Sequence, residues 1–218
     1  MNMDENITHQ GLSITELVND LRPVRTLKPP YGLTFLAIIC LISIVLNGTQ
    51  MGWRPDLLAG TPSEMFLLRA GMLALLGGVT AHAVIAMASP SVGKHSDRWQ
   101  IALACALLFP LAAVIASFTR ESNIAMEHIR SGAECLMMSA IGGIAVAVPM
   151  VLWLRKGAPT SLNRAGWLVG ISAGGLGAFA YNFHCPFSDI VYTGLWYSLA
   201  VAVCAVAGRL VVPPLIRW

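Results

Sequence analysis

Charged residues are scarce in this sequence. Asp, Glu, Lys and Arg make up 11% of the 218 residues, whereas a soluble globular domain carries about 25%. Hydrophobic residues supply 56% of the chain, and the mean hydropathy is +0.68. This composition excludes an ordinary soluble domain and indicates that most of the chain lies in a lipid bilayer.

The first 30 residues lack an apolar run and contain Asp4, Glu5, Glu16 and Asp20. A secretory signal peptide needs a continuous apolar segment behind a basic start. We therefore expect the amino terminus to stay on the side of the membrane where it is synthesised.

The hallmarks of membrane enzymes and transporters are also missing. The absence of a C-x-x-C motif argues against the first alternative, a membrane thiol-redox protein. The apolar runs lack chains of ionisable residues apart from His82, which argues against the second alternative, a small-solute transporter. We expect His82 to be a hydrogen-bonded structural residue. The loops are too short for a catalytic domain, so we expect no enzymatic activity.

What the sequence has instead is a series of six long apolar runs. A spanning helix needs roughly 20 apolar residues, because the hydrocarbon core is about 30 Å thick and each residue rises about 1.5 Å. Five runs meet that length, and the first does so when it is extended to residues 31–52. The predicted runs are Leu33–Leu46, Met65–Ala88, Trp99–Phe118, Cys135–Leu154, Trp167–Phe183 and Ile190–Val212.

The predicted fold is therefore an all-α integral membrane protein with six transmembrane helices and a short cytoplasmic N-terminal amphipathic helix. Residues 1–30 form the cytoplasmic segment and residues 31–218 the transmembrane domain. Lys and Arg gather in cytoplasmic loops, and an N-inside topology places ten of them inside and four outside. Both termini are thus predicted to face the cytoplasm. The inner residues are Arg22, Arg25, Lys28, Lys94, Arg98, Arg155, Lys156, Arg164, Arg209 and Arg217, and the outer ones are Arg54, Arg69, Arg120 and Arg130.

The N-terminal segment carries an amphipathic pattern. Ser13 and Glu16 fit a capping box, and the apolar residues that follow fall on one helical face: Ile14, Leu17, Val18 and Leu21. Such a short helix is marginal alone in water, so this face must be buried. Either it lies on the membrane with Arg22 and Arg25 against anionic headgroups, or it docks into a groove of a cytoplasmic protein. The acidic residues of the segment favour the protein.

Glycine recurs at every fourth position of the fifth run, at Gly166, Gly170 and Gly174, and Gly177 follows. A ridge of small residues lets helices approach closely. We expect this ridge to be a packing surface.

The five cysteines fall into two groups. Cys40, Cys105 and Cys204 lie within apolar runs, where a thiol acts as a small apolar filler. Cys135 opens the fourth run at its outer end, and Cys185 follows the fifth. We therefore expect both to face the periplasm and to be accessible from it.

Two chemistries are open to Cys135 and Cys185. They can form a disulfide if their Cα atoms lie within about 7 Å. Alternatively they can bind a soft metal ion, for which His184 and His128 supply further ligands nearby in the sequence. The residues alone support a sensing role and a permanent structural disulfide equally.

Six short motifs occur in order along nearly the whole chain. They are Asp20-Leu21-Arg22-Pro23-Val24-Arg25, Gly132-Ala133-Glu134-Cys135, Leu154-Arg155-Lys156-Gly157-Ala158-Pro159, Phe183-His184-Cys185-Pro186, Leu195-Trp196-Tyr197 and Leu215-Ile216-Arg217-Trp218. In this order they resemble the NrsF-type family of proteobacterial membrane anti-sigma factors, which are six-span proteins with a short cytoplasmic amino terminus.

The resemblance implies a function that the composition does not. Members of this family hold an extracytoplasmic-function-type sigma factor inactive at the bacterial inner membrane and release it when the envelope is stressed. Two periplasmic-side cysteines are family features and correspond here to Cys135 and Cys185, the candidate sensing residues. The segment from Ile14 to Arg25 corresponds to the candidate sigma-binding element. The implied partners are a cytoplasmic sigma factor and the bilayer, without direct nucleic-acid contact. No cofactor is implied, apart from a soft metal ion acting as the signal.

Overall fold

The computed structural model describes residues 28–88, 126–157, 159–187 and 189–217, together with the isolated positions 104, 107, 111, 114 and 115; of residues 126–129 and 190 it describes the backbone. All regular structure in this part of the chain is helical, so the predicted all-α class is confirmed. The predicted N-terminal helix and its candidate partner-binding residues Ile14, Leu17, Val18, Leu21, Arg22 and Arg25 lie outside the described residues.

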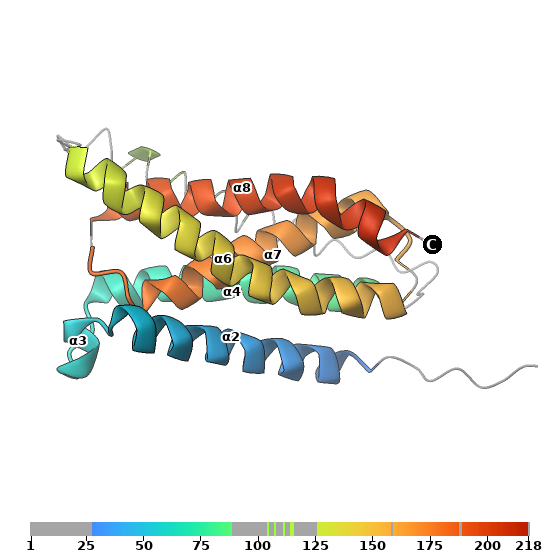
Figure 1. The fold of residues 1–218 in the computed structure, drawn as a ribbon, viewed down its shortest axis with the longest axis horizontal. Coiled ribbons are helices and arrows are strands. Elements are labelled where there is room, and N and C mark those ends of the chain that lie inside the picture. Colours follow the sequence, from blue (N-terminus) through green and yellow to red (C-terminus); the bar gives the residue numbers. More distant parts are fainter. Residues whose placement is uncertain are drawn as a thin grey trace, which may run out of the picture.

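The described helices form an elongated bundle with their axes roughly along one direction (Figure 1). Within these residues, α2, α4, α6 and α8 are long and apolar enough to cross a membrane. The third predicted span, residues 99–118, lies outside the described residues except for its isolated positions, which are helical. The helices are α2 (Pro29–Met51), α3 (Pro55–Leu58), α4 (Glu64–Met87), α6 (Met126–Lys156), α7 (Leu162–Asn182) and α8 (Ile190–Ile216).

Several helix boundaries differ from the sequence prediction; α7, for example, begins at Leu162 rather than at Trp167. The prediction placed a loop up to Glu134, but α6 begins at Met126. Its first turns are polar and carry an exposed Arg130–Glu134 pair at i, i+4 with 4.0 Å between the charged atoms, which a hydrophobicity pattern does not detect. A further difference is that α8 continues through Pro213 and Pro214 to Ile216. Ile216 is buried in the core, and its burial offsets the hydrogen bonds that the two prolines remove.

The helix α7 is central and packs against α4, α6 and α8. The predicted glycine ridge is confirmed as its packing surface. A Cβ on Gly166 would lie 2.9 Å from the Gly208 carbonyl oxygen of α8, and one on Gly174 would lie 2.7 Å from the Val201 Cα. On the opposite side, the Ser172 hydroxyl donates to the Gly77 carbonyl oxygen of α4 (3.0 Å). The small residues of α7 therefore allow its backbone to approach the backbones of α4, α6 and α8 closely.

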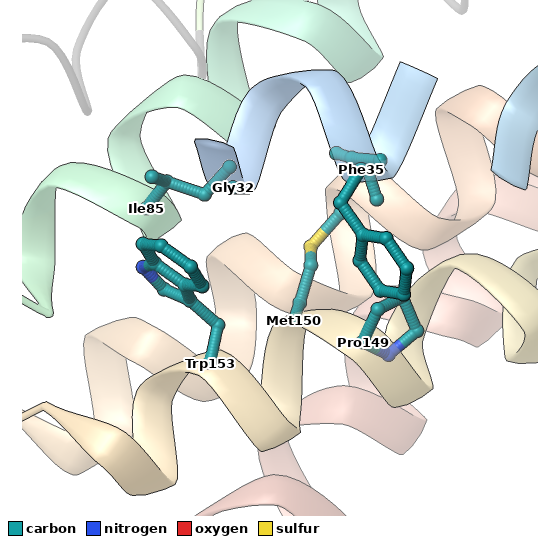
Figure 2. A pocket seen from close by; sticks show the side chains of 7 residues that line it. Gly32, Phe35, Ile85, Pro149, Met150 and Trp153 are labelled. Atoms are coloured by element: carbon teal, nitrogen blue, oxygen red, sulfur yellow. The ribbon is translucent and has the colours of Figure 1, made fainter. Parts of the chain in front are cut away.

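The described residues pack into two buried apolar clusters. The larger one joins α2, α4, α6, α7 and α8, and beside it a shallow apolar groove lies between α2, α4 and α6. Figure 2 shows its lining, in which Trp153 of α6 faces the start of α2. Gly32 permits this approach, because a Cβ there would lie 3.1 Å from the Trp153 ring. The smaller cluster contains Cys135 and Cys185.

The helices α6, α7 and α8 run antiparallel to one another. The beginning of α2 and the end of α8 lie at the same end of the bundle, on the right in Figure 1. The turn with α3, the beginning of α6 and the α7–α8 loop lie at the opposite end. The cysteine cluster is therefore at the end of the bundle remote from Lys28 and Arg217.

Candidate functional site: a buried cysteine pair

Cys135 of α6 and Cys185 of the α7–α8 loop lie against each other as free thiols, close enough for one to hydrogen-bond the other. The sequence prediction that both sit at one end of the bundle is confirmed. The prediction that they are accessible is wrong, because Cys135 is 2% exposed and Cys185 is 1% exposed. Apolar and aromatic side chains of three helices cover them: Leu73, Ala178, Tyr181 and Tyr197.

Local hydrogen bonds fix the short loop that carries Cys185. The Tyr181 carbonyl oxygen at the end of α7 accepts from the backbone N–H groups of His184 (2.9 Å) and Cys185 (3.2 Å). On the other side, the Asp189 carboxylate caps α8 by accepting from the N–H groups of Val191 and Tyr192 (both 3.4 Å). The loop is thus anchored to both helices on either side of the thiol.

Arg54, in the turn that follows α2, holds the Cys185 loop in place. Gly52, with φ of 92°, turns the chain out of α2 in a left-handed conformation that favours glycine. Arg54 is 4% exposed and donates from Nη1 to the Cys185 carbonyl oxygen. Its Nε and Nη2 form a bidentate pair with Asp56 (2.9 and 2.8 Å). The hydrogen bonds from Arg54 hold the pKa of the Asp56 carboxyl well below its usual range.

Arg69 of α4 holds the loop from a second side. Its side chain is 2% exposed, and its Nη1 donates to the Phe187 carbonyl oxygen (2.8 Å). Its guanidinium carbon lies 5.5 Å from the centre of the Tyr197 ring, a cation–π distance. Within the described part of the chain, Arg69 has no carboxylate partner, and its Nε and Nη2 have no hydrogen-bond partner. Arg69 is therefore a buried cation beside the two thiols.

The surroundings of Cys185 favour its ionised form. The pKa of the Cys185 thiol is lowered by the neighbouring Cys135 thiol and by the Arg69 charge, which outweigh the effect of burial. The two sulfurs are adjacent, so a negative charge on one opposes a charge on the other. The arrangement therefore supports one thiolate next to one thiol.

The predicted metal ligands are only partly brought together. His184 donates from Nδ1 to the Gly52 carbonyl oxygen (2.8 Å), and the side chain of His128 lies outside the described residues. Within the described residues, no group of three or more His, Cys, Asp or Glu side chains is arranged to hold a metal ion. Of the predicted ligands that the structure describes, the thiols of Cys135 and Cys185 are therefore the ones placed together to bind a metal ion.

Sequence reasoning did not predict three residues of the site, Arg54, Arg69 and Tyr197, and used the two arginines only as counts of loop charge. The signal was present, because Arg69 follows the first residues of an apolar run, where an ionisable residue is costly and marks a functional position. Two of the sequence motifs also meet here. A Cβ on Gly132 would overlap the Trp196 ring, so this glycine makes room for α8 beside the thiols.

Comparison with known proteins assigns this chain to a family. The chain matches the family NrsF, negative regulator of sigma F, over residues 17–218. It is 30% identical over 206 residues to the anti-sigma-F factor NrsF of Caulobacter vibrioides (strain NA1000 / CB15N), which covers 90% of each chain.

A second relative is the probable anti-sigma-F factor NrsF of Azospira oryzae (strain ATCC BAA-33 / DSM 13638 / PS). It is 27% identical over 170 residues, covering 76% of this chain and 78% of the relative. No solved structure matches the chain. The chain belongs to the NrsF family of negative regulators of sigma F, a family of regulatory proteins rather than enzymes.

Proposed function

We propose that this protein is an anti-sigma factor of the bacterial inner membrane that holds an extracytoplasmic-function-type sigma factor inactive and releases it under envelope stress. In this proposal Cys135 and Cys185 receive the signal. One observation carries the proposal: these two thiols, which are 50 residues apart in the sequence, lie together in one buried polar site. The chain that holds them belongs to a family of sigma-factor regulators.

The proposed topology has six spans with both termini in the cytoplasm. The bundle supports it, because six basic residues lie toward the end that holds Lys28 and Arg217, and three lie toward the opposite end. The six are Lys28, Arg155, Lys156, Arg164, Arg209 and Arg217, and the three are Arg54, Arg69 and Arg130.

In the six-span topology α7 also crosses the membrane. It runs antiparallel between α6 and α8, so it connects the two ends of the bundle. Its helical surface is almost entirely buried against protein. A helix that contacts protein on most sides does not need the lipid-facing apolar residues that identify an exposed span, which explains its lower hydropathy.

The proposed sigma-binding element is the N-terminal stripe of Ile14, Leu17, Val18 and Leu21 with Arg22 and Arg25 beside it. The stripe would occupy an apolar groove on the sigma factor, and the two arginines would face acidic residues at its rim. The match to the family begins at residue 17, so it includes most of this element. A groove occupied by the stripe is closed to RNA polymerase.

The helix α2 provides a physical connection between the thiols and the sigma-binding element. Its last residue, Met51, is three residues before Arg54, which donates to the Cys185 carbonyl oxygen. Its first residue, Pro29, is four residues after Arg25. Twenty-three helical residues span roughly 35 Å, the thickness of the membrane. A displacement of the Cys185 loop would therefore move the end of a rigid rod whose other end leads to the sigma-binding element.

The energy required for release limits the kind of signal. Shifting a two-state equilibrium from 1:99 to 99:1 takes about 5.5 kcal/mol, and the signal must bind or bond differently in the two states. A surface ion pair contributes about 0–1 kcal/mol, which is too little. A disulfide between the two cysteines, or a soft metal ion captured by their sulfurs, supplies energy of the required order.

A reporter of the sigma regulon, combined with co-purification of the sigma factor, tests the proposal. Full-length protein should lose its bound sigma factor when cells receive a thiol oxidant or a soft metal ion. The Cys135→Ser/Cys185→Ser protein should keep it and repress permanently. The matched control is Cys40→Ser/Cys204→Ser, which removes two thiols from the spans and should respond as the natural protein does. Normal induction in the Cys135→Ser/Cys185→Ser protein would contradict the sensing role.

A further inference from the structure

We infer that the groove between α2, α4 and α6 binds one anionic phospholipid, with an acyl chain against Trp153 and the headgroup between Lys28 and Lys156. This site goes beyond the proposed function and is independent of the cysteines. Three features of the described residues support it: the apolar lining and depth of the groove, the positions of the two lysines, and the distribution of charge along the bundle.

The groove is apolar and open to the surroundings of the bundle. Phe35 of α2 lines it and is 55% exposed, and the buried side chains of Met150 and Ile85 also line it. In Figure 2 the Phe35 and Trp153 side chains lie on either side of Met150. Because α2 and α6 are long and apolar enough to cross a membrane, an exposed apolar side chain at this position contacts lipid.

Aromatic residues place the mouth of the groove at the level of the lipid headgroups. Tyr31 is 67% exposed in the first turn of α2, and Trp153 is in the last turn of α6. Trp and Tyr are enriched at this level of a membrane. The lining residues cover about one turn of each helix, which is about 5.4 Å. That length fits the upper part of an acyl chain, whereas a docked helix needs anchors over two turns.

Lys28 and Lys156 lie at the mouth of the groove. Gly32 and Trp153 join its two long walls, since a Cβ on Gly32 would lie 3.1 Å from the Trp153 ring. Lys28 precedes Gly32 by four residues, and Lys156 follows Trp153 by three. Residues three or four apart lie on the same face of a helix. Both lysines therefore lie about one turn beyond this contact, on the groove side, and their long stems let the ammonium groups reach a headgroup.

The charges along the bundle leave these two lysines without a protein counter-ion among the described residues. The ion pairs Arg54–Asp56 and Arg130–Glu134 lie at the opposite end of the bundle. All carboxylates whose side chains are described also lie there: Asp56, Glu64, Glu134 and Asp189. An anionic headgroup supplies the charge that this end lacks.

Selectivity among lipids must come from the lysines. An acyl chain that enters the groove exchanges one apolar environment for another, so the lining positions a chain without choosing its headgroup. The first two residues of α2 are Pro29 and Pro30, which lack the N–H groups that bind phosphate at many helix starts. The ammonium groups are therefore the donors. Each should favour an anionic headgroup about fivefold, the equivalent of about 1 kcal/mol per basic residue.

Fluorescence quenching in vesicles tests the site. Full-length protein in phosphatidylcholine vesicles receives increasing amounts of phosphatidylglycerol or phosphatidylcholine with brominated acyl chains, which quench a nearby tryptophan. The difference between the natural protein and Trp153→Phe gives the Trp153 signal. Brominated phosphatidylglycerol should half-quench this signal at a mole fraction at least about fivefold lower than brominated phosphatidylcholine. Lys28→Gln/Lys156→Gln should abolish this preference.

The matched control is Arg155→Gln/Arg164→Gln, which removes two charges from the same end of the bundle. Arg155 is two residues from Trp153 and so lies on another side of α6, and Arg164 is in the first turn of α7. This variant should keep the preference. Native mass spectrometry gives a second measurement that does not need Trp153→Phe. The natural protein should retain one phosphatidylglycerol molecule from mixed micelles, and the lysine variant should lose it.

Three results would overturn the assignment. Equal quenching by the two brominated lipids would show a groove that accepts any acyl chain. Absence of quenching by both would show that protein covers the groove. An equal loss of preference in the lysine variant and in the arginine control would show a general effect of surface charge instead of a site.

Discussion

Replacing Gly170 with Ala should loosen the contact between α7 and α8. A Cβ at this position would lie 2.6 Å from the Ala205 Cα and would also overlap the Cys204 carbonyl oxygen. Both are backbone atoms, so no side-chain rotation can relieve the overlap. Carbon atoms pack at about 3.5–4.0 Å, so the two helices must separate locally by roughly 1 Å.

The size of the effect follows from that separation. A gap of about 0.5–1 Å forfeits a quarter to a half of the dispersion energy of each contact, and overpacking typically costs about 1–3 kcal/mol. Ala is a better helix former than Gly by about 1 kcal/mol, which offsets part of this. We expect a net loss of about 1–2 kcal/mol for Gly170→Ala.

Gly78→Ala is the matched control. Gly78 lies in α4, and a Cβ there meets no atom of the described residues within 4 Å. The control should leave stability unchanged or raise it by up to about 1 kcal/mol. Unfolding of the purified protein in mixed micelles, followed by helical circular dichroism as the denaturing detergent increases, measures the difference. Equal midpoints for the two variants would refute the packing argument for the glycine ridge.

Three other predictions test separate parts of the proposal. Reporter fusions after Lys156 should report the cytoplasm and fusions near Asp56 the periplasm; the reverse pattern would overturn the topology. Replacing Leu17 and Leu21 with Asp would place charges in the apolar groove of the sigma factor. The regulon should then become constitutively active at normal membrane levels of the protein. Full repression would exclude this helix as the contact. Asp56→Asn should lower the melting temperature at neutral pH. Arg54 lowers the pKa of Asp56 in the folded state. The carboxylate therefore stabilises the fold above its unfolded pKa of about 3.9, and this stabilisation is lost as the pH falls below that value. A difference in melting temperature between the variant and the natural protein that persists unchanged in acid would contradict the pairing.

Sequence patterns predicted the features that depend on local composition. The apolar runs marked α2, α4, α6 and α8 as spans, since transfer into lipid depends on the sum of side-chain hydrophobicity. The glycine spacing marked the face of α7 that meets α8 at Gly166 and Gly174. The position of the cysteines at two outer helix ends placed them at one end of the bundle. These inferences need no knowledge of which helices are neighbours.

The features that were not predicted depend on neighbours distant in sequence. Burial of Cys185 requires side chains from α4, α6 and α8, and nothing near residue 185 in the sequence indicates them. Arg54 and Arg69 were counted as loop charges, yet each donates to a carbonyl oxygen more than 100 residues away along the chain. Hydropathy measures exchange between water and lipid, and it is silent on contacts between one part of a protein and another.

In the proposed function, the burial of the thiols keeps the protein from releasing its sigma factor until a signal arrives. An accessible thiolate would react with every oxidant that reached it, because reactivity follows ionisation and access together. At Cys185 the two are separated: the neighbouring Cys135 thiol and the Arg69 charge favour the ionised form, while packing keeps the residue 1% exposed. Access then depends on local opening of a loop that Arg54 and Arg69 hold closed, and opening is rare where buried contacts and hydrogen bonds are many. Arg69, which favours the ionised sulfur, thus also helps Arg54 to restrict which reagents can reach it.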